Sequence, residues 1–568
     1  MHSSKFVLIS CCASLLFPSL SEAVFVRSPS SSAGIIEREI EQQYESKPVA
    51  PEKPVPLLEV EIPEEQLHVG DGETLWISEV CFTGNTVFSE RELRRVTGIY
   101  CNQELCMKDI HELCLTIQKL YVEKGYFLAR AFPPAQDVVD GILTIEIMEG
   151  ILGEVEVVGN KYYSAHFIRR YFDRFRGKPI NYDQFLKALL LTNENMDLTV
   201  GAVFKKGENF GTADVILRVK DKLPLHAFID YNNYGSHLTT RNRSGVRIDA
   251  GNLLTGGDLL SVTEVLGIPP RGLRFTDVEY TIPLNALGTK LMLGYLFSTF
   301  ELVNTSHHKR GSSQVATIEL EQAVLRTRRL NLDLFGTFDY KRIKNTESGA
   351  TITFDKLRIA GLGLNFDYAD PLWGRNVGDI YASYGIPDFL AGSHAVSHSS
   401  GIPGAGERFW IFNLDLKRIQ QLPLNCFFLF NFSGQLSPDT LPLPEQFYIG
   451  GVDTVRGFPL AVALGDNGFY ANFELRVPPP FSSHRVPGMK KTWRELLQFV
   501  AFIDTGGVFL RHAEVEDQSS HVYLTGGGVG VRLYAPLHID VSADVGFPIT
   551  HQDRGPGAIA YVRVSINI

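Results

Sequence analysis

The chain has 568 residues, of which 44% are apolar, 11% aromatic and 21% charged, a size that corresponds to several ordinary domains or to one very large domain. Its 54 Lys and Arg are outnumbered by 64 Asp and Glu, so the net charge is −10 at pH 7. This balance argues against nucleic acid as the main partner. Outside the first 20 residues no stretch is apolar for long enough to predict a transmembrane helix, although alternating transmembrane strands would leave no such signal.

The first residues have the pattern of a secretory signal peptide, residues 1–23. A short polar start ends at Lys5, an apolar stretch follows, and the small residues Ser21 and Ala23 predict cleavage after Ala23. Cys11 could instead belong to a lipoprotein signal, but cleavage there leaves an apolar stretch of about five residues, which is too short. We therefore expect an exported chain.

The cysteines are concentrated in one place. Cys81, Cys101, Cys106 and Cys114 lie within 34 residues, and Cys426 stands alone. In an exported chain such a cluster predicts disulfides, with three possible connectivities. The spacing does not fit a zinc site, and ordinary buried thiols are the remaining alternative.

The next two segments, 24–45 and 46–75, differ in composition. Gly34–Glu45 is predicted to form a short amphipathic helix with Ile35, Ile36, Ile40 and Tyr44 on one side. Five prolines between Pro48 and Pro63 then predict an extended, semi-rigid linker. A disordered leader is the alternative interpretation of the whole region.

Residues 76–222 contain an internal repeat. The stretch 80–85 recurs as 155–160, an offset of 75 residues that also relates Ser89 to Ser164. Each copy is predicted to run strand, Gly-Asn turn, helix with a Ser cap, second helix and two strands. We therefore expect two β-α-α-β-β modules, at 76–150 and 151–222.

From 223 to the end, apolar and polar residues alternate, as in strands that have two different faces. About sixteen such segments can be delimited, and most connections after odd-numbered segments are longer than those after even-numbered ones. They include a connection of about 13 residues between the seventh and eighth segments. The segments start near 226, 243, 257, 273, 289, 313, 329, 357, 376, 408, 425, 468, 498, 522, 537 and 558.

This alternation of short and long connections is typical of an outer-membrane barrel. In lipid the sheet must close, because no free edge can hydrogen-bond to water. We expect a transmembrane β-barrel of about 16 antiparallel strands at 223–568. Its apolar row faces lipid, and Asp540, Asp544 and Arg563 face a wet lumen.

No signature of an enzyme is present. The zinc-protease, nucleophile-elbow and phosphate-loop motifs are missing from the sequence, so we predict no catalytic residue, cofactor or metal. The glycines at 526–530 lie inside a strand pattern, which favours a closely approached barrel strand over a phosphate loop.

The longest connection, about 437–467, contains Val455-Arg456-Gly457-Phe458, and the thirteenth segment contains Phe502, Asp504 and Gly506. If Asp504 points into the lumen, Phe502 does too, and a carboxylate there seeks a partner such as Arg. On spacing alone, Arg456 as a solvated loop charge is the simpler alternative.

In this order, the modules, the Val-Arg-Gly-Phe loop and the Phe-x-Asp strand resemble the two-partner secretion transporters of the outer membrane, which are built from POTRA domains and a barrel. The resemblance covers nearly the whole mature chain. It implies a plug helix at 34–45, a linker, two POTRA domains and a 16-stranded barrel. It also implies that the loop folds into the lumen as a gate, that Arg456 meets Asp504, that Gly457 permits the tight tip and that Phe458 packs it. Glu474, in an N-x-E-L-R stretch, is a possible lumen support.

Three features depart from the family pattern. The chain ends in Asn567-Ile568 where an aromatic residue is usual, which puts recognition by the assembly machinery in doubt. The connection at about 479–497 is unusually long, and the cysteines of the first module are atypical.

The resemblance implies export of one large, β-helical partner protein, which meets the POTRA domains unfolded in the periplasm and passes through the barrel. Outer-membrane lipid and the outer-membrane assembly machinery are the other expected partners. An outer-membrane protein insertase and a gated porin for small solutes are the alternatives. Two modules favour secretion over insertion, and a porin leaves the repeated modules unexplained.

Overall fold

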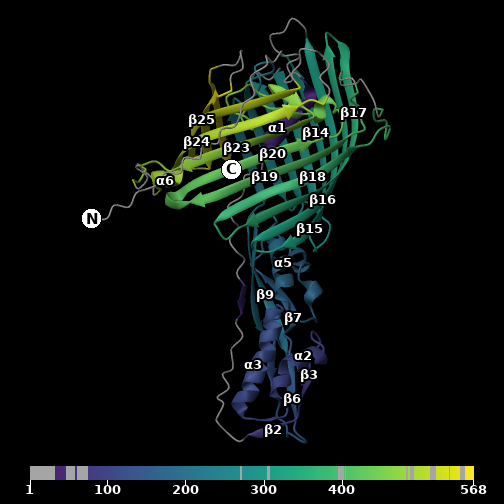
Figure 1. Cartoon of the computed structure of the whole chain (residues 1–568), viewed down its shortest axis with the longest axis vertical. Coiled ribbons are helices and arrows are strands. Elements are labelled where there is room, and N and C mark those ends of the chain that lie inside the picture. Colours follow the sequence, from purple (N-terminus) through teal and green to yellow (C-terminus); the bar gives the residue numbers. More distant parts are fainter. Residues whose placement is uncertain are drawn as a thin grey trace, which may run out of the picture.

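The computed structural model describes residues 32–45, 58–60, 74–268, 272–302, 308–394, 402, 404–480, 484–486, 491–511, 520–536, 538–550 and 557–568. The predicted signal peptide lies outside these residues. A large barrel forms one end of the molecule, and two smaller α/β modules extend from it one after the other (Figure 1).

Sixteen antiparallel strands form the closed barrel, so the predicted fold class is confirmed. The first strand, β10, pairs with the last, β27, and closes the cylinder. The strands are β10 (Leu225–Asn232), β11 (Asn242–Gly251), β12 (Leu259–Ile268), β13 (Leu273–Pro283), β14 (Thr289–Glu301), β15 (Lys309–Arg326), β16 (Leu330–Glu347), β17 (Ala350–Ala369), β18 (Gly374–Gly385), β19 (Trp410–Leu422), β20 (Cys426–Leu436), β23 (Asn467–Val477), β24 (Leu497–Phe509), β25 (His521–Ala535), β26 (Ile539–Pro548) and β27 (Ile559–Asn567).

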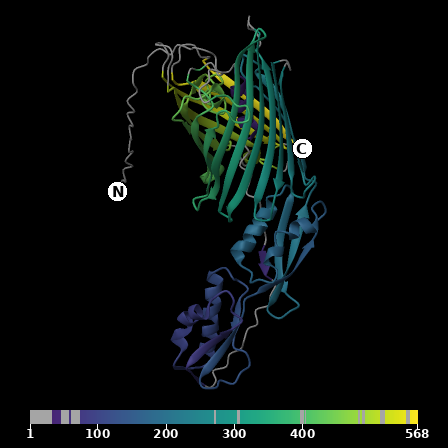
Figure 2. The same ribbon diagram turned by 90° about the vertical axis from the view of Figure 1, so that its right-hand side faces the viewer.

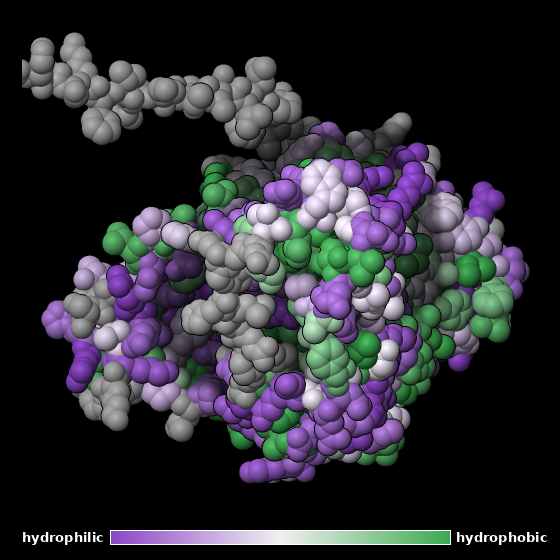
Figure 3. Space-filling view, turned by 90° about the horizontal axis from the view of Figure 1, so that it is seen from below, coloured by the Kyte–Doolittle hydropathy of each residue, from purple (hydrophilic) through white to green (hydrophobic). Residues whose placement is uncertain are grey.

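The alternation along the strands separates two faces of the barrel wall. On β15, for example, Ile318 and Leu320 are each 50% exposed, whereas Val315 is buried inside. Viewed from the module end, hydrophobic residues gather at the right-hand margin of the molecule, and hydrophilic and hydrophobic residues are mixed over the middle of the view (Figure 3). No helix among the described residues is long and apolar enough to cross a membrane.

The predicted 13-residue connection between the seventh and eighth strands is wrong. Only Ser348 and Gly349 separate β16 from β17, and both have positive φ angles of 48° and 86°, as a tight hairpin turn requires. The error arose because the ends of these long strands are polar, since they extend beyond the apolar band. Their apolar alternation therefore stops before the strands do.

The two modules have the predicted order of elements, and their sheets have the same topology. In each, the strand before the first helix runs parallel to the last strand, which pairs antiparallel with the strand before it; the first module adds a separate two-stranded sheet of β2 and β4. The first module contains β2 (Leu75–Ile77), β3 (Glu79–Thr83), α2 (Glu90–Thr97), β4 (Gln103–Leu105), α3 (Met107–Glu123), β5 (Arg130–Phe132) and β6 (Ile142–Met148). The second contains β7 (Ile151–Val158), α4 (Ala165–Arg169), α5 (Tyr182–Asn193), β8 (Leu198–Lys206) and β9 (Thr212–Asp221).

A carboxylate closes the turn between the first strand and the first helix in each module, and that of the first module, Glu149, is buried. Glu149 accepts hydrogen bonds from the backbone N–H groups of Thr86 and Val87 at 2.6 and 2.8 Å. Asp221 accepts them from residues 161–163, the positions related to 86–88 by the repeat. The motif comparison missed this pairing because the two carboxylates differ in residue type and do not share the offset of 75.

We expect Asp221→Asn to weaken the second module by about 1–3 kcal/mol, because the backbone N–H groups lose a charged acceptor. Burial alone would raise the pKa of Asp221, but hydrogen bonds from Tyr163, Lys161 and Tyr162 outweigh it and lower the pKa. The folded pKa thus lies below the ordinary value of about 3.9, so the stabilisation is present above that pH and is lost as the pH falls through the folded pKa.

Hydrogen exchange of the segment containing residues 161–163 in the full-length protein measures this effect. Exchange in the Asn variant should be about 5- to 150-fold faster at pH 7, and the difference should shrink at pH 3. Asp183→Asn, on the same module but outside the turn, is the control. Equal exchange of Asp221→Asn and the unmodified protein at pH 7 would contradict the assignment.

The disulfide prediction is not met, since Cys81, Cys101, Cys106 and Cys114 are all free thiols in the structure. Cys114 faces the core of the first module from α3, and burial raises the pKa of its thiol to about 11. Cys106 instead occupies the N-cap position of the same helix, and the other two lie on β3 and after the turn at 98–100. The four cysteine side chains therefore lie in different local environments.

The second module is fixed to the barrel by ionic contacts. Glu194, at the end of α5, lies 2.9 Å from Lys290 of β14 and 2.5 Å from Arg326 of β15. The first module lies beyond the second, away from the barrel (Figure 2). In the predicted linker, β1 (Leu58–Val60) pairs in parallel with β8 of the second module.

Candidate functional site: the occupied barrel lumen

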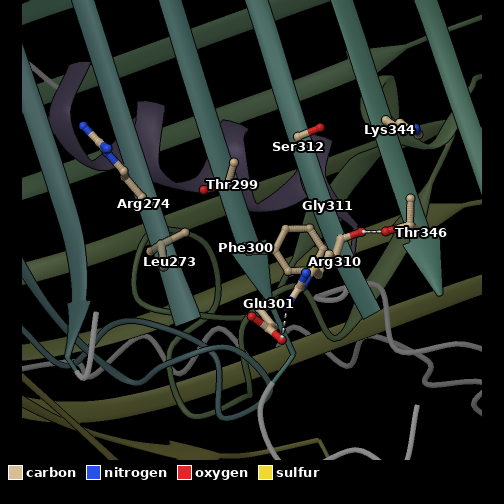
Figure 4. Close-up of a pocket in the computed structure, with 10 residues that line it drawn as sticks. All are labelled: Leu273, Arg274, Thr299, Phe300, Glu301, Arg310, Gly311, Ser312, Lys344 and Thr346. Carbon is tan, nitrogen blue, oxygen red and sulfur yellow. Dashed lines mark hydrogen bonds and ion pairs between the residues drawn. The ribbon is translucent and has the colours of Figure 1, made fainter. Parts of the chain in front are cut away.

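Helix α1 (Ala33–Glu45) lies inside the barrel, behind strands β13–β16 (Figure 4). Its side chains Ile36 and Ile40 are 1% and 0% exposed and pack against the wall. Ile35, on another side of the helix, packs against the long loop instead. The predicted helix is therefore present, with apolar contacts on two sides because both wall and loop surround it; the side chain of Tyr44 is outside the described part of the chain.

The loop at 437–466 folds back into the lumen and contacts α1 directly. The loop contains a short helix, η6 (Leu443–Glu445), and a hairpin of β21 (Phe447–Ile449) and β22 (Ala463–Gly465). Arg38 of α1 donates hydrogen bonds to the carbonyls of Pro444 and Gln446 at 3.1 and 2.9 Å. Glu445 forms a 3.0 Å ion pair with Lys341 of the wall. Helix and loop thus occupy the lumen as one packed unit.

At the tip of the loop, Arg456 meets Asp504 of β24. Its Nε and Nη2 atoms lie 2.7 and 3.0 Å from the two carboxylate oxygens, a bidentate arrangement, and its backbone N–H donates to the same group at 3.1 Å. The guanidinium carbon is 3.5 Å from the ring centre of Phe502. Arg456 is 5% exposed and Asp504 is fully buried, so this is not a solvated loop charge.

Four further charged side chains surround this pair. Glu474 of β23 and Asp544 of β26 lie 3.0 and 3.4 Å from Arg456. Arg532 of β25 contacts both of these carboxylates, at 3.5 and 2.6 Å, and Arg476 lies 2.7 Å from Glu474. We call the six residues the Arg456 cluster: Arg456, Arg476, Glu474, Asp504, Arg532 and Asp544.

Glycines of the wall permit the close approach of the tip. A Cβ atom on Gly526 would lie 1.9 Å from the carbonyl oxygen of Arg456, and one on Gly546 would lie 2.6 Å from the nitrogen of Gly457. Gly457 itself has a φ of 95°, which favours glycine. The prediction that 526–530 is a closely approached strand is confirmed.

The other predicted residues pack around the tip. Val455 and Phe458 are 0% and 1% exposed and join an apolar cluster that includes Val508 and Leu524 of the wall. A Cβ atom on Gly506 would lie 3.2 Å from the Val455 side chain. The structure therefore brings all eight predicted site residues to one place: Val455, Arg456, Gly457, Phe458, Glu474, Phe502, Asp504 and Gly506.

Sequence reasoning missed several residues of the site. Tyr561 of β27 accepts a hydrogen bond from the N–H of Gly457 and donates one to the carbonyl of Phe458, both at 3.2 Å. Arg532 and Arg38 were missed as well. The only sequence signal for these three residues was their inward position in the strand or helix pattern. Among the described residues, no group of His, Cys, Asp and Glu could hold a metal ion.

A sixteen-stranded barrel with an inward-folded, arginine-tipped loop and two repeated modules defines a POTRA-barrel transporter of the outer membrane. The chain belongs to the family described as haemolysin secretion/activation protein ShlB/FhaC/HecB, whose model matches residues 211–533. A ShlB-type POTRA domain model matches residues 75–150. The predicted class, a two-partner secretion transporter of the outer membrane with periplasmic POTRA domains, is confirmed.

Curated relatives support the same assignment. The chain is 24% identical over 493 residues to the outer membrane transporter CdiB of Dickeya dadantii, covering 84% of each chain. It is 26% identical over 418 residues to the hemolysin transporter protein ShlB of Serratia marcescens, covering 70% of this chain and 71% of the relative. The fold is similar to that of CdiB from Escherichia coli, with a TM-score of 0.73, 20% identity, and 97% of this chain and all of that chain covered.

Proposed function

We propose that this protein receives one large partner protein, unfolded, at its POTRA modules and exports it through the barrel after α1 and the loop have left the lumen. The observation that carries the proposal is the Arg456 cluster, which holds the tip of the inward-folded loop against the wall of a closed barrel by charged contacts. A permanent seal would not need a buried bidentate ion pair at the tip of a connection, because apolar packing would serve as well. The protein itself catalyses no reaction.

Free sheet edges offer a way to capture the partner. β-Augmentation depends mainly on backbone geometry, so an unfolded chain of any sequence can add a strand. The edge of β8 already holds an extended segment of this chain, β1. Its counterpart in the first module, β5, has no strand beyond it among the described residues. We propose that the partner's secretion signal pairs with such an edge.

The names of the relatives indicate the kind of exported protein only in outline. Their names include a hemolysin transporter and heme/hemopexin transporters, and for this chain we propose a large, β-rich secreted protein. Because no nucleotide-binding motif is present in the sequence, we propose that folding of the partner outside the cell drives its passage.

Deletion of the gene in its host, followed by quantitative proteomics of medium, periplasm and outer membrane, tests the proposal. One large protein should disappear from the medium and return with a plasmid copy. General depletion of outer-membrane barrels would instead indicate an insertase. An unchanged medium with altered uptake of small solutes would indicate a porin.

A further inference from the structure

The outward face of β13–β17 carries a group of basic side chains near the extracellular end of the barrel. The direction of each side chain follows from the alternation along a strand. Leu273, Phe300 and Ile343 are buried against α1 or the apolar cluster around it in the lumen. Their neighbours Arg274, Thr299 and Lys344 therefore point outward, and Figure 4 shows them on strands that lie in front of the helix.

An apolar surface begins directly below this group, on the side toward the periplasm. The outward residues Leu293, Ile318 and Leu320 are 42%, 50% and 50% exposed. Tyr295, which is 51% exposed, follows in register with Ala316, as in the aromatic girdle that marks the edge of the hydrocarbon layer. The basic group thus lies at the level of the lipid headgroups of the outer leaflet.

Most of this positive charge is not neutralised by the protein. Arg274 and Arg310 have acidic partners, Glu264 at 2.8 Å and Glu301 at 3.2 Å. For Arg342, Lys344 and Lys356, no ion pair with a carboxylate of the described residues is found. We call these three residues the basic patch.

The register makes this arrangement unfavourable for the protein alone. Arg342 and Lys356 are direct cross-strand partners, and like charges placed opposite each other destabilise a sheet. Both lie near the ring of Phe354, at 5.7 and 5.0 Å from its centre, which only partly offsets the repulsion. A multivalent anion at this position would remove it.

A hollow of about 320 Å³ lies beside the patch. Its lining includes Lys344, the hydroxyl groups of Thr299, Ser312 and Thr346, and the carboxylate of Glu301, which is paired with Arg310 at 3.2 Å. Hydroxyl and ammonium groups in one depression suit the oxygens of a phosphorylated sugar. The guanidinium of Arg342, in the neighbouring basic patch, suits phosphate.

We propose that the basic patch and this hollow bind the phosphorylated headgroup of a lipopolysaccharide molecule of the outer leaflet, with its acyl chains on the apolar surface below. The proposal goes beyond protein export, because it depends only on the barrel lying in the outer membrane. The bound lipid would hold the long β16–β17 hairpin at a fixed depth in the membrane.

Native mass spectrometry of the full-length protein in detergent tests the proposal, with purified deep-rough lipopolysaccharide as the probe. The variant Arg342→Gln/Lys344→Gln/Lys356→Gln should bind the lipid at least about tenfold more weakly, since each basic residue near an anionic headgroup contributes to binding. Lys108→Gln/Lys205→Gln/Lys206→Gln, with three exposed charges removed from the POTRA modules, should bind like the unmodified protein.

Two further arms identify the ligand. Lipid dephosphorylated by phosphatase should bind the unmodified protein at least about tenfold more weakly, and inorganic phosphate at the same concentration should not displace the intact lipid. Heat-modifiable migration in gels verifies that each barrel is folded. Equal binding by the patch variant, equal binding of the dephosphorylated lipid, or displacement by free phosphate would each overturn the proposal.

Discussion

Arg456→Ala should abolish export of the partner while the barrel still assembles. Asp504 is fully buried, and its ion pair with Arg456 is its only one among the described residues. Leaving such a charge uncompensated costs about 3–5 kcal/mol, so the loop tip should no longer dock on the wall, and the ordered closing and opening on which we propose that export depends should fail. Glu474 and Asp544 retain their ion pairs with Arg532 in this variant, so the strands of the barrel wall should remain assembled.

Immunoblots of the partner in medium and periplasm measure export, and heat-modifiable migration measures barrel assembly. Arg456→Lys should retain only part of the function, because lysine keeps the charge but loses the bidentate geometry. Arg408→Ala, an exposed arginine of another loop, is the control. Because Arg456→Ala/Asp504→Asn removes both charges, its thermal stability should exceed that of Arg456→Ala. Normal export by Arg456→Ala would reject the proposed role of the loop.

Removal of residues 24–56, which include α1, should turn a mostly closed channel into one that conducts continuously in planar bilayers. The helix fills space between the wall and the loop, and Ile36 and Ile40 would leave an apolar site that opens to water. The loop remains in this variant, so its combination with Arg456→Ala should conduct more than either change alone.

Arg38→Gln supplies a graded test of the same plug. It removes the charged donor to the Pro444 and Gln446 carbonyls, a loss of about 1.5–3 kcal/mol that would raise the ratio of open to closed channels by about tenfold or more. Arg94→Gln, on the surface of the first module, is the control. Unchanged conductance of the deletion variant would contradict plugging.

The sequence predicted the barrel well because every membrane-spanning strand must repeat one physical pattern, apolar outward and polar inward. It failed where that constraint ends, as at the β16–β17 hairpin. The site was predicted unevenly for a similar reason. Arg456 and Asp504 could be paired only through the family resemblance, since 48 residues separate them and periodicity does not encode which inward side chains meet.

Residues such as Tyr561 and Arg532 show the same limit more clearly. Each is one inward position among many on its strand, and its importance depends on where a distant loop comes to lie. The prediction for the cysteines failed in the opposite way, because it expected contacts among these described residues that the structure does not contain. The proximity of the cysteines in sequence suggested pairing, but Cys114 faces the core of the first module from α3, while Cys106 occupies the N-cap of that helix.

The composition of the Arg456 cluster has a consequence for the open channel. Once the loop has withdrawn with its arginine, two arginines on the wall face three carboxylates, which leaves a local charge of −1. Cations should therefore permeate this level of the pore more readily than anions. The reversal potential across a salt gradient would then distinguish channels whose loop has withdrawn from channels that have lost only the helix.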